Sequence, residues 1–441
     1  MPTISNIMKK SVLLIDPPFQ KFMGFSKGGI PLGLLSLAGK LKRDGYSVDV
    51  LDSDYNPNGT PYPFVAKMAH YDEYLDNLNN GNHPIWENIT SEISDLRPDI
   101  VGVSMISTKL RSGLRVAQIA KDLGVERIIA GGPHVTMHPE DVLGNGSPID
   151  SAVQGEGDGE GVFERALKEK LVTADRIKDI KSLAWPARES LIGLGDYNPT
   201  DLGFVMSSRG CPWTCNFCCS ESLWGRTVTS REISDVADEM DSIRSNYGTN
   251  KFYLVDDTFT LRKKRVGEFC DSIQDKNYEW SCLTRVDALD ESILEKMINS
   301  GCSLIKVGVE SGSQRVLDLM DKRISISQIE NTAKLLNRSS MKWLAYLMVG
   351  TPGETPIDVN ETMDLVNRVQ PSYVSAAVYT PYAGTGFLRN QGKVDFALEE
   401  ANHHSLNVLA GDIPRGKIME FMEFADRYNA ASKAAQEIYK C

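Results

Sequence analysis

The stretch that decides the fold reads Cys211-Pro-Trp-Thr-Cys215-Asn-Phe-Cys218, so three cysteines fall within eight residues. It lies just after the apolar run at 203–207, which has the length and composition of a buried strand. Several thiols on one short loop that leaves a strand are typical of a metal site in a protein without a disulfide framework. The loop is therefore predicted to bind metal.

Three thiolates on such a loop can hold three irons of a [4Fe–4S] cubane and leave the fourth iron open to another ligand. A zinc site would normally add a second Cys-x-x-Cys pair or nearby histidines, and the nearest, His134 and His138, lie far back in the chain. Inert core cysteines are the other alternative. The favoured interpretation is an iron–sulfur cluster with the metal ligands Cys211, Cys215 and Cys218.

The remaining cysteines are not expected to take part in this site. Cys219 adjoins Cys218, and two adjacent cysteines cannot both ligate one cubane comfortably. Cys219 is therefore expected to be a small buried residue. Cys270, Cys282 and Cys302 lie in helix or strand patterns and are expected in the core.

The three-cysteine loop lies near the start of a series of short apolar runs that alternate with helical stretches. The predicted strands are 203–207, 251–255, 278–283, 304–309, 342–349 and 373–379. These make six βα units, whereas a full (β/α)₈ barrel needs eight. We therefore expect a partial (β/α)6 barrel over 201–385, followed by a small C-terminal helical region over 386–441.

A second alternating series lies N-terminal to the barrel. Its predicted strands are 11–16, 47–52, 99–104, 127–130 and 150–153. Continuous apolar strands separated by helices predict α/β architecture, here an N-terminal Rossmann-like doubly wound parallel sheet. This domain is expected over 1–170, with an insertion at 55–90, and residues 171–200 are expected to form a linker.

Glycines follow two of these N-terminal strands. In a doubly wound sheet, ligands bind beyond the carboxyl ends of the strands. Small residues there let a ligand approach the backbone closely. The candidate cofactor-binding residues are Gly131, Gly132, Gly155 and Gly157.

Composition excludes several classes of protein. A chain of 441 residues suggests two or three domains. The formal net charge is -11 and no basic run occurs, which argues against nucleic acid as a partner. No apolar run approaches the ~20 residues of a membrane span, and the apolar start resembles a first strand rather than a signal peptide. A cytoplasmic protein with a small-molecule substrate is expected.

The Cys-x3-Cys-x2-Cys spacing resembles the signature of the radical S-adenosylmethionine superfamily, and Phe217 matches the aromatic residue before its last cysteine. The resemblance implies that the open iron binds S-adenosyl-L-methionine through its amino and carboxylate groups. One electron then cleaves this cofactor to methionine and a 5′-deoxyadenosyl radical. An electron donor such as flavodoxin or ferredoxin is implied as a partner.

The resemblance also assigns residues at the ends of the barrel strands. Asp256 and Asp257 match the place where the family binds the methionine amino group, and a carboxylate suits an ammonium. A helix cap is the equally weighted alternative for Asp257. Arg285 could pair with a carboxylate of cofactor or substrate, or form a structural salt bridge.

Two further strand ends carry candidate cofactor contacts. Glu310 and Ser311 resemble a family position that faces the ribose or methionine part of the cofactor, with a helix cap as the alternative. Met348 lies at the end of the fifth strand and Gly350 opens a Gly-Thr-Pro-Gly-Glu-Thr stretch, which in the family lies near the adenine. No residue stands out as a proton or hydrogen donor.

The N-terminal region resembles the cobalamin-binding domains fused to one branch of this superfamily. The matching stretches are Asp16-Pro-Pro, Pro31-Leu-Gly-Leu, Val101-Gly-Val-Ser104, Gly131-Gly-Pro-His134 and Gly155-Glu-Gly157. No Asp-x-His-x-x-Gly sequence occurs, so no histidine is offered as the usual lower axial ligand. The domain either binds cobalamin or keeps the fold without it.

Together the two resemblances favour cobalamin-dependent C-methylation of a small metabolite or natural-product precursor. The first alternative is a cobalamin-independent radical dehydration, epimerisation or rearrangement beside a vestigial cobalamin domain. The second alternative is a non-catalytic cobalamin or metal sensor.

Overall fold

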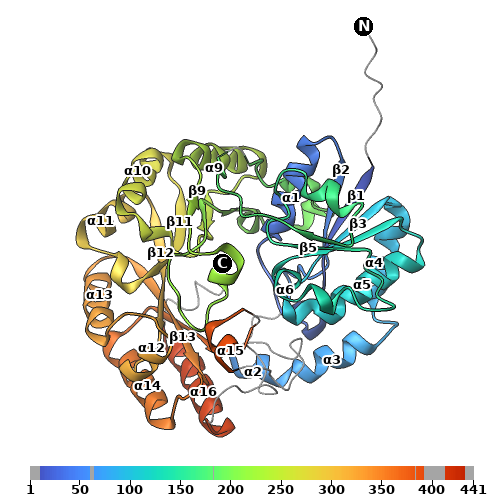
Figure 1. Ribbon diagram of the computed structural model, residues 1–441. Helices are drawn as coiled ribbons and strands as arrows, with labels where there is room; N and C mark the ends of the chain where they lie inside the picture. The colour runs from blue at the N-terminus through green and yellow to red at the C-terminus, as the bar shows by residue number, and fades with distance from the viewer. Residues whose placement is uncertain (1–9, 60–63, 182, 383, 392–412, 433–441) are drawn as a thin grey trace. The chain divides into compact units, whose positions relative to one another are not determined.

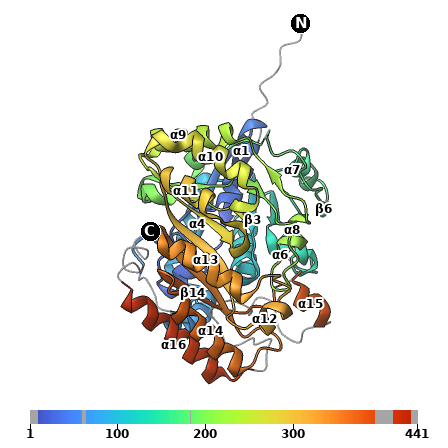
Figure 2. The ribbon, with the colours of Figure 1, turned by 90° about the vertical axis from the view of Figure 1, so that its left-hand side faces the viewer.

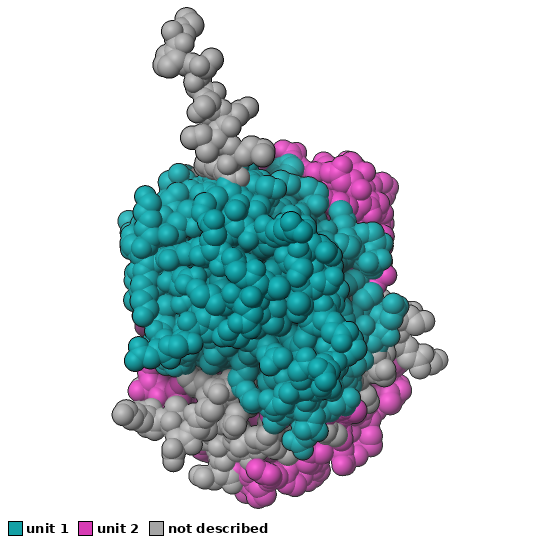
Figure 3. Space-filling view, turned by 90° about the vertical axis from the view of Figure 1, so that its right-hand side faces the viewer, with its two compact units in different colours: residues 1–60, 72–197 teal, residues 61–71, 198–441 magenta. Residues whose placement is uncertain are grey.

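The computed structural model describes residues 10–59, 64–181, 183–382, 384–391 and 413–432. The chain forms two compact units (Figure 3). Unit 1 comprises residues 1–60 and 72–197, and unit 2 comprises residues 61–71 and 198–441. No helix among the described residues is long and apolar enough to cross a membrane.

Unit 1 is built on a fully parallel sheet of the order β2-β1-β3-β4-β5-β6. Its strands are β1 (Ser11–Asp16), β2 (Ser47–Asp52), β3 (Ile100–Ser104), β4 (Arg127–Gly131), β5 (Ser151–Gln154) and β6 (Leu171–Thr173). The order reverses between β1 and β3, which is the kind of switch point where doubly wound sheets bind ligands. The predicted Rossmann-like sheet is confirmed.

Helices lie on both faces of this sheet (Figure 1). They are α1 (Leu32–Arg43), α4 (Pro84–Leu96), α5 (Leu110–Asp122), α6 (Pro133–Met137) and α7 (Val162–Ala166), whereas α3 (Tyr71–Asn79) packs against the segment at Phe19 and Phe22. Helix side chains such as Leu35, Ile89 and Val116 are buried, and so are strand residues such as Ile15 and Val101. Burial from both sides explains why these strands are continuous apolar runs.

Two segments differ from their predicted placement. Residues 171–200 carry β6, and Leu191 pairs with Val50, so residues 171–197 belong to unit 1 instead of forming a free linker. β6 escapes a search for apolar runs because it has three residues and only Val172 is buried. Within 55–90, residues 61–71 carry α2 (Phe64–Ala69), which belongs to unit 2 and packs against the C-terminal helix of that unit.

Unit 2 is built on a second parallel sheet of the order β14-β13-β12-β11-β10-β7. Its strands are β7 (Phe204–Val205), β10 (Lys251–Leu254), β11 (Glu279–Arg285), β12 (Cys302–Glu310), β13 (Lys342–Val349) and β14 (Tyr373–Val378). Its longer covering helices are α9 (Ile233–Tyr247), α10 (Lys263–Ile273), α11 (Glu291–Asn299), α13 (Ile326–Arg338) and α14 (Pro356–Val369). These helices form an outer arc around the strands (Figure 1), which confirms the predicted partial barrel.

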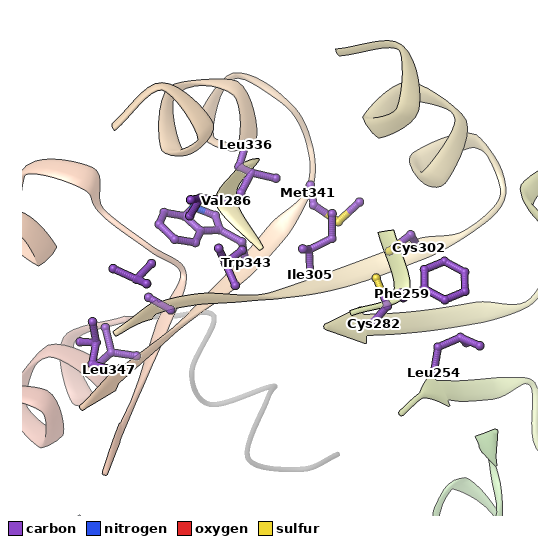
Figure 4. Close-up of a cluster of buried hydrophobic side chains, with 14 of the residues drawn as sticks. Leu254, Phe259, Cys282, Val286, Cys302, Ile305, Leu336, Met341, Trp343 and Leu347 are labelled. Atoms are coloured by element: carbon purple, nitrogen blue, oxygen red, sulfur yellow. The ribbon is translucent and has the colours of Figure 1, made fainter. Parts of the chain in front are cut away.

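The core of unit 2 lies between the strands and these helices (Figure 4). Trp343 is buried in it, and its indole N–H donates to Asn337 Oδ1 at 2.7 Å. Cys282 and Cys302 are buried in the same cluster. Their position agrees with the expectation that these cysteines serve packing.

The C-terminal helix α16 (Arg415–Ala431) covers the last strand of the sheet. Ile418, Phe421 and Met422 are buried on its inner face. The backbone N–H of Val374 donates to Asn429 Oδ1 at 3.0 Å, and Asn429 Nδ2 donates to the Val374 carbonyl at 2.9 Å. Asn429 thus satisfies backbone groups that an edge strand leaves open.

Candidate functional site

The cluster loop, residues 211–218, connects β8 (Ser208–Arg209) to α8 (Ser220–Trp224) in unit 2. Cys211 and Cys215 are half-buried, Cys218 is exposed, and none of the three forms a disulfide. The Cys218 N–H donates to the Cys215 carbonyl at 3.0 Å, which closes a turn between these two cysteines. The structure thus presents all three predicted metal ligands on one short loop.

Each thiol of the cluster loop has a polar neighbour. Cys211 Sγ lies 3.8 Å from Thr258 Oγ1, and Arg285 Nη1 donates to Cys215 Sγ at 3.9 Å. The Ser220 N–H donates to Cys218 Sγ at 3.4 Å. Donors to cluster sulfurs are among the features that set the reduction potential of an iron–sulfur centre.

Burial raises the pKa of the half-buried Cys215 thiol. Cys215 is therefore a thiol at neutral pH, and metal must displace its proton. Among the described residues, no three His, Cys, Asp or Glu side chains surround one point as ligands of a single ion. A cubane needs no such point, because each cysteine binds a different iron. The donor set fits a [4Fe–4S] cluster with one iron left open.

Asp256 and Asp257 hold the segments on either side of the cluster loop. Asp256 is fully buried and accepts hydrogen bonds from the Ser207 N–H and from the hydroxyls of Ser207 and Ser208, at 2.6 to 2.7 Å. Asp257 Oδ2 accepts from the Gly210 N–H at 3.0 Å and from Ser220 Oγ at 3.3 Å. Both carboxylates therefore position the loop, and their predicted contact with the methionine amino group stays a prediction.

Arg285, at the end of β11, is buried behind the cluster loop. Its guanidinium pairs with both oxygens of Asp287 at 3.0 and 3.1 Å and donates to the Lys322 carbonyl at 2.9 Å. It also lies 4.1 Å from the centre of the Trp213 ring. The structural salt bridge that the sequence left open thus exists, and the same side chain reaches Cys215.

Glu310 ends β12 and forms a buried ion pair that sequence reasoning missed. Lys322 Nζ donates to Glu310 Oε1 at 2.6 Å and lies 5.4 Å from the Phe217 ring centre. Glu310 has φ 67°, an uncommon backbone angle for a residue other than glycine. A Cβ at Gly308 would come within 2.7 Å of Glu310 Oε1, so glycine leaves room for the pair. No pattern around Lys322 signals this contact, because Lys322 lies in a loop after α12 (Gln314–Leu319).

Ser311 points toward α14 rather than toward the cluster loop. Its hydroxyl lies 3.2 Å from Thr362 Oγ1 and accepts from the Ser313 N–H at 3.1 Å. The geometry fits the alternative that Ser311 stabilises the start of α12.

Gly350 and Glu354 close the turn after β13. The N–H groups of Gly350 and Thr351 donate to Glu354 Oε2 at 2.7 and 3.0 Å. Gly350 has φ 86°, which glycine adopts without strain. Burial raises the pKa of Glu354 to about 7. Met348 is half-buried on the preceding strand.

The strand ends of unit 1 carry the other predicted cofactor residues. Gly132 has φ 101° and its added Cβ would lie 2.8 Å from the Met105 carbonyl oxygen, while a Cβ at Gly155 would lie 2.6 Å from the Ala174 carbonyl oxygen. Gly131 and Gly157 instead have nothing within 4 Å of an added Cβ. The first two glycines are required by the backbone, and the second two border open space that a cofactor could use.

His134 is buried, with 1% of its surface exposed. Its Nδ1 lies 3.0 Å from Ser107 Oγ and its Nε2 lies 3.2 Å from Asp141 Oδ2. Both ring nitrogens are thus occupied by protein partners, and His134 is not placed as a metal ligand.

A buried charge network at the carboxyl ends of β1 and β2 was not predicted. Lys109 Nζ contacts both oxygens of Asp16 at 2.8 Å, and Lys27 Nζ contacts Asp16 at 2.9 Å and Asp52 at 3.0 Å. Burial favours a raised pKa for Asp16, but Lys109 and Lys27 lower it to about 2. Asp54 lies 3.1 Å from Lys109.

Fold and site together define an enzyme in which a Rossmann-like cofactor domain is joined to a partial barrel with a three-cysteine cluster loop. The family model of the radical SAM superfamily matches residues 205–366, and that of the B12 binding domain matches residues 27–164. The chain thus combines a radical S-adenosylmethionine domain with an N-terminal B12 binding domain. The predicted cofactors, a [4Fe–4S] cluster, S-adenosyl-L-methionine and cobalamin, are those of these two domains.

Relatives match most of the chain. An uncharacterized methyltransferase of Pyrococcus horikoshii is 28% identical over 403 residues, 85% of this chain and 81% of that protein. Anaerobic magnesium-protoporphyrin IX monomethyl ester cyclase of Rubrivivax gelatinosus is 27% identical over 93% of this chain and 75% of the cyclase. Cytidylyl-2-hydroxyethylphosphonate methyltransferase of Streptomyces wedmorensis is 23% identical over 88% of this chain and 83% of that enzyme.

Solved structures share the fold. The radical S-adenosylmethionine methyltransferase TsrM from Kitasatospora setae, with cobalamin and a [4Fe–4S] cluster bound, superposes with a TM-score of 0.64 at 17% identity. The match covers 86% of this chain and 78% of TsrM. The cobalamin-dependent S-adenosylmethionine radical enzyme OxsB gives a TM-score of 0.61 at 15% identity, over 97% of this chain and 56% of OxsB.

Proposed function

We propose that the chain is a cobalamin-dependent radical S-adenosylmethionine enzyme that methylates a carbon atom of a small metabolite or natural-product precursor. The observation that carries the proposal is the presence of a cluster loop and a B12 binding domain in one chain. Relatives from Pyrococcus horikoshii and Streptomyces wedmorensis are named methyltransferases. TsrM is described with a tryptophan substrate, which supports a small organic substrate.

When bound, the cluster and S-adenosyl-L-methionine supply a 5′-deoxyadenosyl radical, and cobalamin supplies a methyl group. In unit 2, Cys211, Cys215 and Cys218 hold the cluster. Asp257 follows β10 and Glu310 ends β12, and their carboxylates suit the ammonium and ribose groups of the cofactor. Asp256 positions the cluster loop indirectly, through its hydrogen bonds with Ser207 and Ser208.

The remaining assignments follow the strand ends. Arg285 keeps a cation beside the cluster loop, and Phe217 and Met348 offer apolar surface to the cofactor. The turn at Gly350 brings backbone close to the adenine. In unit 1, Gly131 and Gly157 border the space proposed for cobalamin. Because the nitrogens of His134 are occupied, cobalamin binds there without a ligand from this histidine.

The test is anaerobic reconstitution with iron, sulfide and cobalamin, followed by turnover of candidate substrates with S-adenosyl-L-methionine that carries a deuterated methyl group. Each methylation should yield one 5′-deoxyadenosine, one S-adenosylhomocysteine and one labelled product, because one cofactor molecule gives the radical and another gives the methyl group. Turnover by cobalamin-free protein would contradict the proposal.

A second candidate is a radical rearrangement or ring closure without methyl transfer. It is favoured by the cyclase of Rubrivivax gelatinosus, which aligns over 93% of this chain. The same assay separates the two candidates. A rearrangement forms 5′-deoxyadenosine but neither S-adenosylhomocysteine nor a labelled product.

The proposed reaction needs an electron donor such as flavodoxin or ferredoxin. It also needs a reducing compartment, because the three cluster cysteines must not form disulfides if they are to bind iron. Each of the seven described cysteines is unpaired, which supports the cytoplasm.

A further inference from the structure

The outer side of the cluster loop reaches the surface of unit 2. Pro212 and Cys218 are both exposed, whereas the opposite side of the loop contacts buried side chains such as Arg285. An electron for the cluster must come from a donor brought close to this loop. The charges around the exposed side therefore bear on which donor can approach.

Three exposed arginines contact the cluster loop or the helix that follows it, and we call them the arginine rim. Arg226 follows α8, Arg323 follows α12, and Arg389 lies in α15 (Gly386–Gln391). Their side chains are 66%, 58% and 52% exposed. Figure 2 shows α8, α12 and α15 at the same end of unit 2.

Hydrogen bonds tie the arginine rim to the loop and its flanks. Arg226 Nε and Arg389 Nη2 contact the two oxygens of Glu221 at 2.9 and 3.1 Å. Arg323 Nη2 donates to the hydroxyl of Thr214, which precedes Cys215, at 3.2 Å. Arg323 thus contacts the cluster loop itself, and Arg226 and Arg389 contact α8, which directly follows the loop.

The carboxylates that contact the rim do not balance its charge. Glu221 serves two arginines, and Asp321 pairs with Arg323 at 2.9 Å. Among the side chains that the structure describes at the rim, three guanidiniums against two carboxylates leave one positive charge, although the whole chain has a formal net charge of -11. A local positive charge on an acidic protein attracts an acidic partner to one place and repels it elsewhere.

We propose that the arginine rim, Arg226, Arg323 and Arg389, is the docking surface for an acidic one-electron donor protein of the flavodoxin type. The proposal rests on the proposed function, which requires an external electron. Exposed arginines favour interfaces because they form paired hydrogen bonds with carboxylates. Docking here would bring the donor's cofactor next to the exposed edge of the cluster loop.

The experiment compares two reductants on the reconstituted holoenzyme, with cleavage of S-adenosyl-L-methionine to 5′-deoxyadenosine as the readout. Dithionite needs no docking surface, whereas a photoreduced bacterial flavodoxin does. The triple variant Arg226→Glu, Arg323→Glu, Arg389→Glu should keep the dithionite rate and lose about tenfold or more of the flavodoxin rate at low ionic strength. Added salt should shrink the difference between wild type and variant.

The matched control is Arg427→Glu, which reverses an exposed arginine of α16 that also pairs with a glutamate, Glu423. It should behave like wild type with both reductants. The milder triple variant Arg226→Gln, Arg323→Gln, Arg389→Gln removes charge and keeps polar side chains, so it guards against local misfolding. Flavodoxin binding to the cluster-free protein, measured by calorimetry, should weaken in both triple variants.

Equal flavodoxin rates and equal flavodoxin binding in wild type and both triple variants would overturn the docking surface. Wild-type protein that carries its cluster and cleaves no S-adenosyl-L-methionine with dithionite would instead refute the proposed function, and the docking surface with it. The two failures are therefore distinguishable.

Discussion

At the scale of the residue, the cluster loop depends on neighbours that are distant in the sequence. Asp257 binds Gly210 and Ser220, on either side of the loop. Arg285 reaches Cys215 from β11. Protein groups outside the loop therefore hold it in place, which is how a protein prepares the geometry of a metal site.

The three cluster cysteines and their neighbour Cys219 should respond differently to removal. Alanine at Cys211, Cys215 or Cys218 removes an iron ligand, so cluster loading and cleavage of S-adenosyl-L-methionine should be lost. Cys219→Ala should keep the cluster. Iron and sulfide content after anaerobic reconstitution checks this, and loss of iron from the Cys219 variant would refute the ligand assignment.

The Glu310–Lys322 pair should be costly to break. Their side chains are only 10% and 6% exposed. Lys322→Met leaves a buried carboxylate without its partner, which should lower the free energy of unfolding by about 3–5 kcal/mol. Denaturant unfolding of the cluster-free protein measures the loss.

Arg368→Met is the control for this pair, because Arg368 forms an exposed pair with Glu330 and its loss should cost about 1 kcal/mol or less. Adding Glu310→Gln to Lys322→Met should restore part of the stability, because the uncompensated charge is gone. Equal unfolding curves for the Lys322 and Arg368 variants would show that the buried pair contributes little.

At the scale of the element, the two glycines at the end of β4 are expected to have different roles. The backbone requires Gly132, whereas Gly131 borders the space proposed for cobalamin. Gly132→Ala places a side chain at φ 101° and 2.8 Å from the Met105 carbonyl oxygen, so unfolding should become easier by about 1–3 kcal/mol. Gly131→Ala meets no atom within 4 Å and should leave stability unchanged. It should weaken cobalamin binding, measured by titration of the apoprotein. Normal cobalamin affinity in Gly131→Ala would remove this glycine from the proposed site.

The carboxyl end of β1 should make the stability of unit 1 sensitive to acid. The pKa of Asp16 is about 2 in the folded chain and about 3.9 in an unfolded one. Asp16 therefore stabilises the fold fully above about pH 4, and this contribution is lost as the pH falls toward 2. Lys27 and Lys109 supply the stabilising charge.

Unfolding curves collected between pH 5 and 2 test this dependence. The wild-type chain should lose stability across that interval more steeply than Asp16→Asn, which has no carboxyl group to protonate there. The variant should also be less stable at pH 7, because Lys27 and Lys109 lose a charged partner. Parallel pH profiles for the two proteins would contradict the assignment.

At the scale of the whole molecule, both sheets were predictable from the sequence. Parallel strands that helices cover on both faces have continuous apolar sequences, and helical stretches separate them. The six strands of the partial barrel and five of the six in unit 1 appear in this way. β6 was missed because three residues with one buried side chain carry no periodic signal. Lys322 and the network around Asp16 were missed because such contacts depend on tertiary structure, not on local spacing.

The last prediction concerns whether unit 1 holds cobalamin. The match of residues 27–164 to the B12 binding domain favours an occupied domain, and the occupied nitrogens of His134 favour binding without a histidine ligand. Protein purified anaerobically from cells supplied with cobalamin should therefore release cobalamin on denaturation, identified by mass spectrometry.

Paramagnetic resonance of the reduced, bound cobalamin should show no coupling to a histidine nitrogen. Such coupling, lost in His134→Ala, would show that the ring leaves Ser107 and Asp141 when the cofactor binds. Protein that contains no cobalamin and still transforms its substrate would leave unit 1 as a scaffold and favour radical rearrangement over methyl transfer.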